Sequence, residues 1–287
     1  MTALKEWWDG GRFVQLGGHR YFTRVGGDGP TLVFLHGFPT SSHDWAEVIA
    51  ELMPGFRCVT FDYLGHGASD KPPGADYSAL VQTDRALAVL DALEVRGATV
   101  VAHDLGGILL QEILRRHGEG RLALALDGAI FVNSSVYADL YRPTPAQTVL
   151  ADPEEGPRLA RQINRQVFEA SMRALFPHAP PTPERFDDLW AAVDRDDGRL
   201  LWTRQLVYMA ERGRLGAAWE AALEAASTPL GFIYGLADPI SGAQILERVA
   251  ERLPAARRVG LDRLGHFPQV EAPAAVAAAL RSILEAR

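Results

Sequence analysis

Short runs of apolar residues recur along the first half of the chain, and each run ends at turn residues. Longer stretches between them have the helical spacing of apolar positions. Strands that alternate with helices indicate β–α–β units, and continuous apolar runs are typical of parallel strands buried on both faces. We therefore predict an α/β fold with a mostly parallel central sheet flanked by helices. The predicted strands are residues 31–36, 58–62, 98–103, 125–133, 230–235 and 257–262.

The pattern changes between residues 138 and 226, which are rich in Pro and Arg and contain helical stretches without a convincing strand. Because the strand pattern returns at residue 230, we predict that 138–226 is a helical cap inserted into one α/β core. That core then consists of residues 1–137 and 227–287. The helical stretches predicted in these parts are 43–52, 78–93, 109–117, 158–176, 199–212 and 275–286, and residues 13–25 are predicted to form a hairpin that turns at Gly17 and Gly18.

Composition narrows the possible partners and location. Lys and Arg number 29 against 36 Asp and Glu, a net charge of −7, so the chain lacks the basic surface that nucleic acids require. Cys58 is the single cysteine, which excludes an intrachain disulfide and a thiolate metal cluster. The first residues do not have the pattern of a secretory signal, and no stretch of about 18 apolar residues occurs. We expect a cytoplasmic protein with no membrane span.

Three polar residues follow predicted strands in an order that suggests a catalytic triad. Asp104 lies in Ala102-His103-Asp104-Leu105-Gly106, which matches the small-x-nucleophile-x-Gly pattern of a strand–turn–helix elbow with Asp as the nucleophile. Asp238 follows the strand predicted at residues 230–235, and His266 follows the strand predicted at 257–262. The chain order is therefore nucleophile, acid, His. Asp104 alone could cap a helix, and the other two could be ordinary loop residues. Their shared place beyond the carboxyl ends of parallel strands favours catalysis.

Five segments carry a resemblance that extends over nearly the whole chain. They are HGFPTSSHDW (36–45), FDYLGHGASDKP (61–72), AHDLGG (102–107), YGLADP (234–239) and LGHFPQVEAP (264–273). The chain resembles the α/β-hydrolase fold superfamily, in the epoxide hydrolase and haloalkane dehalogenase branch, which has an Asp nucleophile. The stretch DDGRLLWTRQLVYMAERG (196–213) also resembles the mesoderm-specific-transcript subgroup.

The resemblance implies the α/β-hydrolase fold and assigns roles within it. Asp104 would form an alkyl ester, and His266, oriented by Asp238, would activate water to hydrolyse it. The backbone N–H groups of Phe38 and Leu105 would form the oxyanion hole. Three further positions near the nucleophile are predicted to border the substrate, although packing is the alternative for the two histidines: His36, Pro39 and His103.

Enzymes of this branch differ in the leaving group that they release and in the residues that stabilise it. Haloalkane dehalogenases typically have a Trp after the nucleophile, and fluoroacetate dehalogenases an Arg, but this chain has Leu105. Epoxide hydrolases tolerate an apolar residue there and usually use two cap tyrosines to protonate the leaving oxygen. Tyr208 is predicted to be one of them, while the second is missing or replaced, with His178 and Trp202 as candidates. Tyr141 and Trp202 are also predicted to contact substrate.

We therefore expect an epoxide hydrolase that converts a small apolar epoxide to a vicinal diol. The alternatives are a haloalkane or haloacid dehalogenase with the same nucleophile, a serine-type esterase, and a non-catalytic ligand-binding homologue. No metal-ligand spacing and no phosphate-binding glycine loop is present, so we expect neither a metal nor a cofactor. A homodimer is possible. An apolar cavity could be lined by cap residues that would otherwise form the cap core: Phe168, Phe176, Trp190, Trp202 and Leu206.

Overall fold

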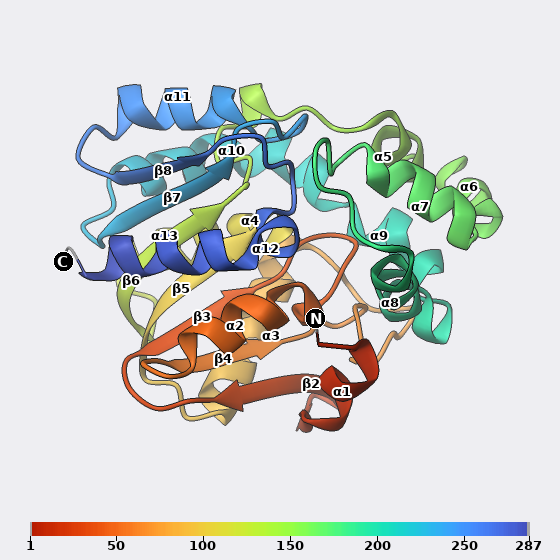
Figure 1. Ribbon diagram of the computed structural model, residues 1–287, viewed down its shortest axis with the longest axis horizontal. Helices are drawn as coiled ribbons and strands as arrows, with labels where there is room; N and C mark the ends of the chain where they lie inside the picture. The colour runs from red at the N-terminus through yellow and green to blue at the C-terminus, as the bar shows by residue number, and fades with distance from the viewer. Residues whose placement is uncertain (1, 286–287) are drawn as a thin grey trace.

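The computed structural model describes residues 2–285 and is built around one eight-stranded sheet (Figure 1). The strands lie in the order β1-β2-β4-β3-β5-β6-β7-β8. The second strand is antiparallel to both of its neighbours, and the pairs from β4 to β8 are parallel. In chain order the strands are β1 (Arg12–Leu16), β2 (His19–Gly26), β3 (Thr31–Leu35), β4 (Arg57–Phe61), β5 (Gly97–His103), β6 (Ala125–Val132), β7 (Leu230–Gly235) and β8 (Arg257–Leu261).

The strand predictions and the α/β fold class are confirmed. The predicted hairpin is β1 and β2, joined where Leu16 pairs with His19. Gly17 and Gly18 have φ angles of 57° and 81°, the left-handed region that a two-residue hairpin turn of this type requires and that glycine adopts at low cost.

Helices cover both faces of the sheet, which explains why the strands are apolar on both sides (Figure 1). On one face α2 and α13 pack together over the sheet. On the other face lie α3, α4, α10 and α11. The helices of the core are α1 (Leu4–Asp9), η1 (Ser42–Trp45), α2 (Ala46–Leu52), α3 (Ala79–Ala92), α4 (Leu105–Gly118), α11 (Ala243–Arg252), α12 (Pro268–Glu271) and α13 (Pro273–Glu285). Residue 286, predicted to belong to the last helix, lies outside the described residues.

Between β6 and β7 the chain forms helices, and the segments η2 to α9 gather beside the carboxyl ends of the central strands (Figure 1). The last helix, α10, packs along α4. The predicted stretch 158–176 is broken in two, because the Asn164 side chain accepts a hydrogen bond from Val167 N and starts a new helix. These segments are η2 (Ala138–Leu140), α5 (Pro145–Leu150), α6 (Gly156–Gln162), α7 (Arg165–Arg173), α8 (Pro183–Asp194), η3 (Arg195–Leu201), α9 (Trp202–Gln205) and α10 (Tyr208–Glu224).

Among residues 2–285, none of these helices combines the length and the apolar character needed to span a bilayer.

Candidate active site

Asp104 occupies a sharp turn between β5 and α4. Its φ and ψ angles are 48° and −111°, a conformation that few residues with a side chain adopt. The turn is possible because two glycines on α4 let neighbouring backbone approach. A Cβ on Gly106 would lie 2.8 Å from Leu35 O, and one on Gly107 would lie 2.3 Å from Ser134 Oγ. The helix begins at Leu105, close to Gly107, where the elbow pattern predicts its start.

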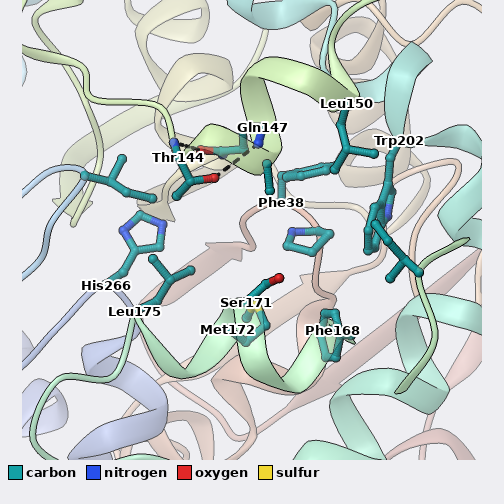
Figure 2. Close-up of a pocket in the computed structure, with 14 residues that line it drawn as sticks. Phe38, Thr144, Gln147, Leu150, Phe168, Ser171, Met172, Leu175, Trp202 and His266 are labelled. Carbon is teal, nitrogen blue, oxygen red and sulfur yellow. Dashed lines mark hydrogen bonds between the residues drawn. The ribbon is translucent and has the colours of Figure 1, made fainter. Parts of the chain in front are cut away.

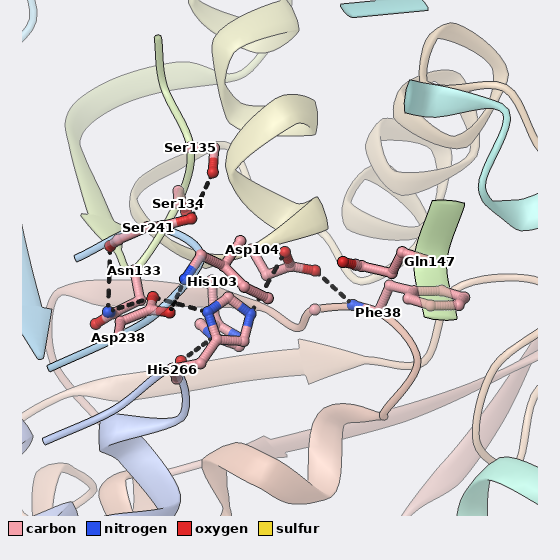
Figure 3. Close-up of polar contacts among 12 residues, drawn as sticks. Phe38, His103, Asp104, Asn133, Ser134, Ser135, Gln147, Asp238, Ser241 and His266 are labelled. Atoms are coloured by element: carbon pink, nitrogen blue, oxygen red, sulfur yellow. Dashed lines mark hydrogen bonds and ion pairs between the residues drawn. The ribbon is translucent and has the colours of Figure 1, made fainter. Parts of the chain in front are cut away.

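The His266 ring lies between two carboxylates, from Asp238 and Asp104 (Figure 3). His266 Nδ1 is 2.8 Å from Asp238 Oδ2, and His266 Nε2 is 3.6 Å from Asp104 Oδ2. All three side chains are buried. The structure therefore brings the three predicted triad residues together from the ends of β5, β7 and β8.

The charges of these groups are strongly coupled. Burial by itself would lower the pKa of His266, but Asp238 and Asp104 raise it to about 10. Burial would raise the pKa of Asp104, but the contacts with His266 hold it well below its usual range. The arrangement therefore favours an imidazolium between two carboxylates in the resting site.

Asn133 is a site residue that the sequence analysis missed. Its Nδ2 donates to Asp238 Oδ2 over 2.8 Å, and its Oδ1 accepts from Gly235 N over 2.8 Å. Asp238 Oδ1 accepts from Ile240 N over 2.7 Å. Together these contacts fix the carboxylate opposite His266. An Asn at the end of a strand is common in turns, so this position gave no distinct indication of its role in the sequence.

The predicted oxyanion-hole donors lie on opposite sides of Asp104. Phe38 N donates to Asp104 Oδ1 over 2.8 Å (Figure 3). Leu105 is the first residue of α4, so its N–H belongs to a helix end whose donors have no partner within the helix.

His36 and His103 support the loops and do not belong to the cavity lining. The His36 ring stacks on Tyr63 with ring centroids 4.0 Å apart, and its Nε2 accepts from Tyr63 N over 3.2 Å. His103 Nε2 is 2.7 Å from His266 O. Burial lowers the pKa of His36 to about 3 and that of His103 to about 4, so both rings are neutral at pH 7. Their predicted substrate contact is therefore replaced by packing beneath the site.

A largely apolar cavity opens beside His266 and Phe38, with helices α5 and α7 in its wall (Figure 2). Its lining is mainly apolar with a few polar groups, the usual composition of small-molecule sites. Pro39, Phe168 and Trp202 line it as predicted, whereas Phe176, Trp190 and Leu206 pack within the protein. Lining residues from α5 and α7 include Gln147, Leu150, Phe168 and Met172.

Two side chains in the cavity wall, Gln147 and Trp202, have N–H groups without a hydrogen-bond acceptor among the described residues. The Gln147 side chain closes a capping box, in which its Oε1 accepts from Thr144 N over 2.9 Å. That contact leaves the Gln147 amide nitrogen without an acceptor among residues 2–285. The indole N–H of Trp202 also has no acceptor in this part of the chain. Both side chains are buried, so these donors are available to a bound molecule.

Tyr208 and Tyr141 form a pair close to the nucleophile. Both hydroxyls are buried, and neither makes a hydrogen bond of ordinary geometry within the described part of the chain. Each phenol affects the pKa of the other, and the Asp104 charge acts on both. Burial raises the pKa of Tyr141 to about 12 and that of Tyr208 well above its usual value. His178, a predicted candidate for the second donor, is exposed, whereas Tyr141 interacts with Tyr208.

Residues 30–273 match the family described as alpha/beta hydrolase fold. The Mycobacterium tuberculosis protein LipZ is 39% identical over 285 residues, which cover 98% of each chain. The mouse mesoderm-specific transcript protein is 34% identical over 94% of this chain and 84% of its own length. A Mesorhizobium japonicum haloalkane dehalogenase is 39% identical over a shorter part, 36% of this chain and 33% of its own.

Among solved structures, an alpha/beta hydrolase fold protein from Burkholderia ambifaria superimposes with a TM-score of 0.80. Its sequence is 26% identical, and the match covers 94% of this chain and 97% of that one.

Proposed function

Because this chain belongs to the α/β-hydrolase fold family, we propose that it is an epoxide hydrolase acting on small apolar epoxides through an ester on Asp104. A carboxylate is a poor nucleophile toward acyl carbon but displaces a leaving group at saturated carbon. The nucleophile therefore argues against a serine-type esterase. The observation that carries the proposal is the pair of buried phenols, Tyr141 and Tyr208, whose hydroxyls have no hydrogen bond among residues 2–285 and whose pKa values the Asp104 charge raises.

In the first half of the reaction, an Asp104 oxygen attacks an epoxide carbon and the carbon–oxygen bond of the ring breaks. The ring oxygen leaves as an alkoxide on the same molecule, so it needs a proton. Tyr208 donates that proton, with Tyr141 as its partner. The apolar cavity excludes competing water and positions the carbon against the carboxylate.

In the second half, His266 takes a proton from water, and the resulting hydroxide attacks the carboxyl carbon of Asp104. The N–H groups of Phe38 and Leu105 stabilise the tetrahedral oxyanion. The diol oxygen then leaves and takes the proton from His266. The second water proton remains on the Asp104 carboxyl and returns through solvent to the phenol that lost one.

The charges in the site determine the order of the two half-reactions. His266 is held protonated while Asp104 is negative, because the two charges stabilise each other. When Asp104 becomes an ester, its charge is lost and the pKa of His266 falls. The ring can then release that proton to solvent and act as a base, so the base becomes available only after the nucleophile has reacted. When the ester is hydrolysed and Asp104 is a carboxylate again, His266 takes a proton back from solvent.

A second candidate function is dehalogenation, and one specific observation favours it. The N–H groups of Trp202 and Gln147 face no protein acceptor among the described residues, and Trp and amide N–H groups can hold a departing halide. Replacement of Trp202 by Phe removes one of these donors. A dehalogenase would lose haloalkane turnover in W202F, whereas an epoxide hydrolase would keep most of its epoxide turnover.

The test uses His266→Gln, in which the base is removed and the ester on Asp104 should accumulate. The intact protein is incubated with a panel of epoxides and haloalkanes, and its mass is measured. A gain equal to the whole epoxide, absent in the double variant H266Q/D104N, supports the proposal. A gain equal to the alkyl group alone, only from haloalkanes, identifies a dehalogenase. Binding without any adduct would instead support a non-catalytic, ligand-binding protein and overturn both enzyme assignments.

A further inference from the structure

Arg212 is a buried cation near the phenol pair. It lies on α10, one helical turn after Tyr208, and only 6% of its surface is exposed. Its Nη1 donates to Ser135 O, and its Nε has no partner in the described structure. Arg212 makes no ion pair with any carboxylate of residues 2–285. The Arg212 guanidinium is therefore buried without a carboxylate of the described residues paired with it.

A charge that is buried without a partner destabilises the folded protein. A side chain that served only to donate to Ser135 O could be neutral and avoid that cost. The other buried arginine, Arg185, also makes no ion pair among residues 2–285 and also has an unpartnered Nε, although the charge of Asp44 acts on it. What distinguishes Arg212 is the Tyr141 ring against which its guanidinium lies.

The contacts of Arg212 show which group can use its charge. The guanidinium carbon lies 4.6 Å from the centroid of the Tyr141 ring, the geometry of a cation–π contact. Arg212 also acts on Tyr208 and on Tyr234, whose hydroxyl donates to Ser134 O and is therefore already satisfied. The two phenols without hydrogen bonds lie within the influence of Arg212 and of Asp104, whose charges affect them in opposite directions.

We propose that Arg212 is a positioning residue that fixes the Tyr141 ring and supplies the positive charge that stabilises the tyrosine pair while it is deprotonated. This inference deepens the proposed function and rests on it. When the epoxide carbon–oxygen bond breaks, the proton moves from Tyr208 to the alkoxide and a phenolate remains. Tyr141 donates its hydrogen to that phenolate, and the Arg212 charge stabilises the pair until the proton left on Asp104 returns.

The first test measures the phenol directly and needs no substrate. A fluorinated tyrosine, which ionises at lower pH, replaces Tyr208, and its pKa is followed by absorbance. Arg212→Met should raise that pKa by about one unit or more, the usual effect of removing a neighbouring opposite charge. Arg212→Lys keeps the charge and should raise it less. An unchanged pKa in R212M overturns the proposal, whatever the enzyme's substrate is.

The second test compares two leaving groups in the H266Q background, by mass spectrometry of quenched single turnovers. Butylene oxide requires a proton donor, whereas butyl bromide releases a halide that requires none. R212M should slow ester formation from the epoxide about tenfold or more, which is part of the roughly 10²- to 10⁴-fold that general acid catalysis contributes in total. It should leave the bromide rate within about twofold. Equal slowing of both would mean that Arg212 only maintains the cavity, which overturns the proposal.

Two controls complete the design. Arg212→Gln is neutral but can still donate to Ser135 O, so it gives a second chargeless variant if R212M does not fold. Arg248→Met is the matched control, because Arg248 lies 5.6 Å from the Tyr137 ring and pairs with Asp139 outside the cavity. It should change neither measurement. If the unmodified site opens no epoxide, the proposed function fails, and the phenol pKa alone then decides the role of Arg212.

Discussion

His266 contacts Asp238 and Asp104 through opposite ring nitrogens, at 2.8 Å and 3.6 Å. The shorter contact fixes the ring, and the longer one leaves the Asp104 oxygen free to move toward a substrate carbon. One imidazole therefore joins the group that orients it to the group that reacts. The consequences of this link can be measured without knowing the natural substrate.

Replacing Asp104 by Asn should lower the pKa of His266 from about 10 by at least about one unit, because one of the two charges that raise it is removed. The pKa is measured by NMR titration of the imidazole carbons. The exposed ion-pair residue Asp70 gives the matched control, since D70N should leave that pKa unchanged. A His266 pKa that is the same in D104N and the unmodified protein would contradict the proposed release of the base.

The tyrosine pair predicts a second result. Tyr208→Phe and Tyr141→Phe should each slow epoxide opening by about 100-fold, the lower end of the range for general acid catalysis. The rate is that of adduct formation in the H266Q background. Tyr63→Phe gives a control on a buried tyrosine whose hydroxyl donates to His36 O instead. If neither cap variant slows the reaction, another group must protonate the alkoxide.

A third prediction concerns the loop that aims Phe38 N at Asp104. A Cβ on Gly37 would lie 2.7 Å from His103 Nδ1 and 2.8 Å from Asp104 Cβ, so Gly37→Ala must displace the loop or the nucleophile. We expect ester hydrolysis to slow by about 10²-fold, as when one oxyanion donor is lost. Gly55→Ala, where an added Cβ meets nothing within 4 Å, is the control. Unchanged hydrolysis in G37A would show that Phe38 N does not serve the oxyanion.

Glu271 predicts a pH dependence of stability. Burial raises the pKa of Glu271 to about 7, although both of its oxygens accept from Gly265 N beside the catalytic His266. A raised carboxyl pKa means that the folded state binds the proton more tightly, so stability is highest below the ordinary pKa of 4.5 and is lost as pH rises through about 7.

Glu271→Gln should remove that loss, which we place on the order of 1 kcal/mol after allowing for solvent screening. The free energy of unfolding in urea is measured for both proteins between about pH 5 and 8. Since Glu247 is exposed, E247Q serves as the control and should keep the slope of the unmodified protein. The same slope in E271Q would show that Glu271 does not titrate as described.

The sheet and the convergence of the three candidate triad residues could be predicted from the sequence for one physical reason. Parallel strands end at the same edge of a sheet, so Asp104, Asp238 and His266 had to converge once the strands were identified. Their distance along the chain did not matter. The strict alternation of strand, turn and helix left little freedom in where each side chain would lie.

The arrangement of the helices between β6 and β7 was harder to predict from the sequence. Helical spacing shows which face of a helix is apolar, but not where the helix lies in the fold. Tyr141 follows the short segment η2 and Tyr208 begins α10, and nothing in their separation indicates that the two phenols meet. Arg212 has the sequence character of an ordinary charged residue on a helix surface. Only its burial against the Tyr141 ring distinguishes it from the other arginines.

The packing of α10 along α4 has a consequence for how this protein could diversify. Asp104 immediately precedes α4 and Tyr208 begins α10, and the Trp219 indole of α10 donates to Glu112 of α4 over 3.0 Å. The proposed nucleophile Asp104 and the proposed acid Tyr208 thus lie at the starts of two helices that pack against each other. Helices α5 and α7 supply much of the cavity wall. Mutations in that wall can accumulate without altering the distance between nucleophile and acid, so selection can exchange one substrate for another while the reaction is inherited intact.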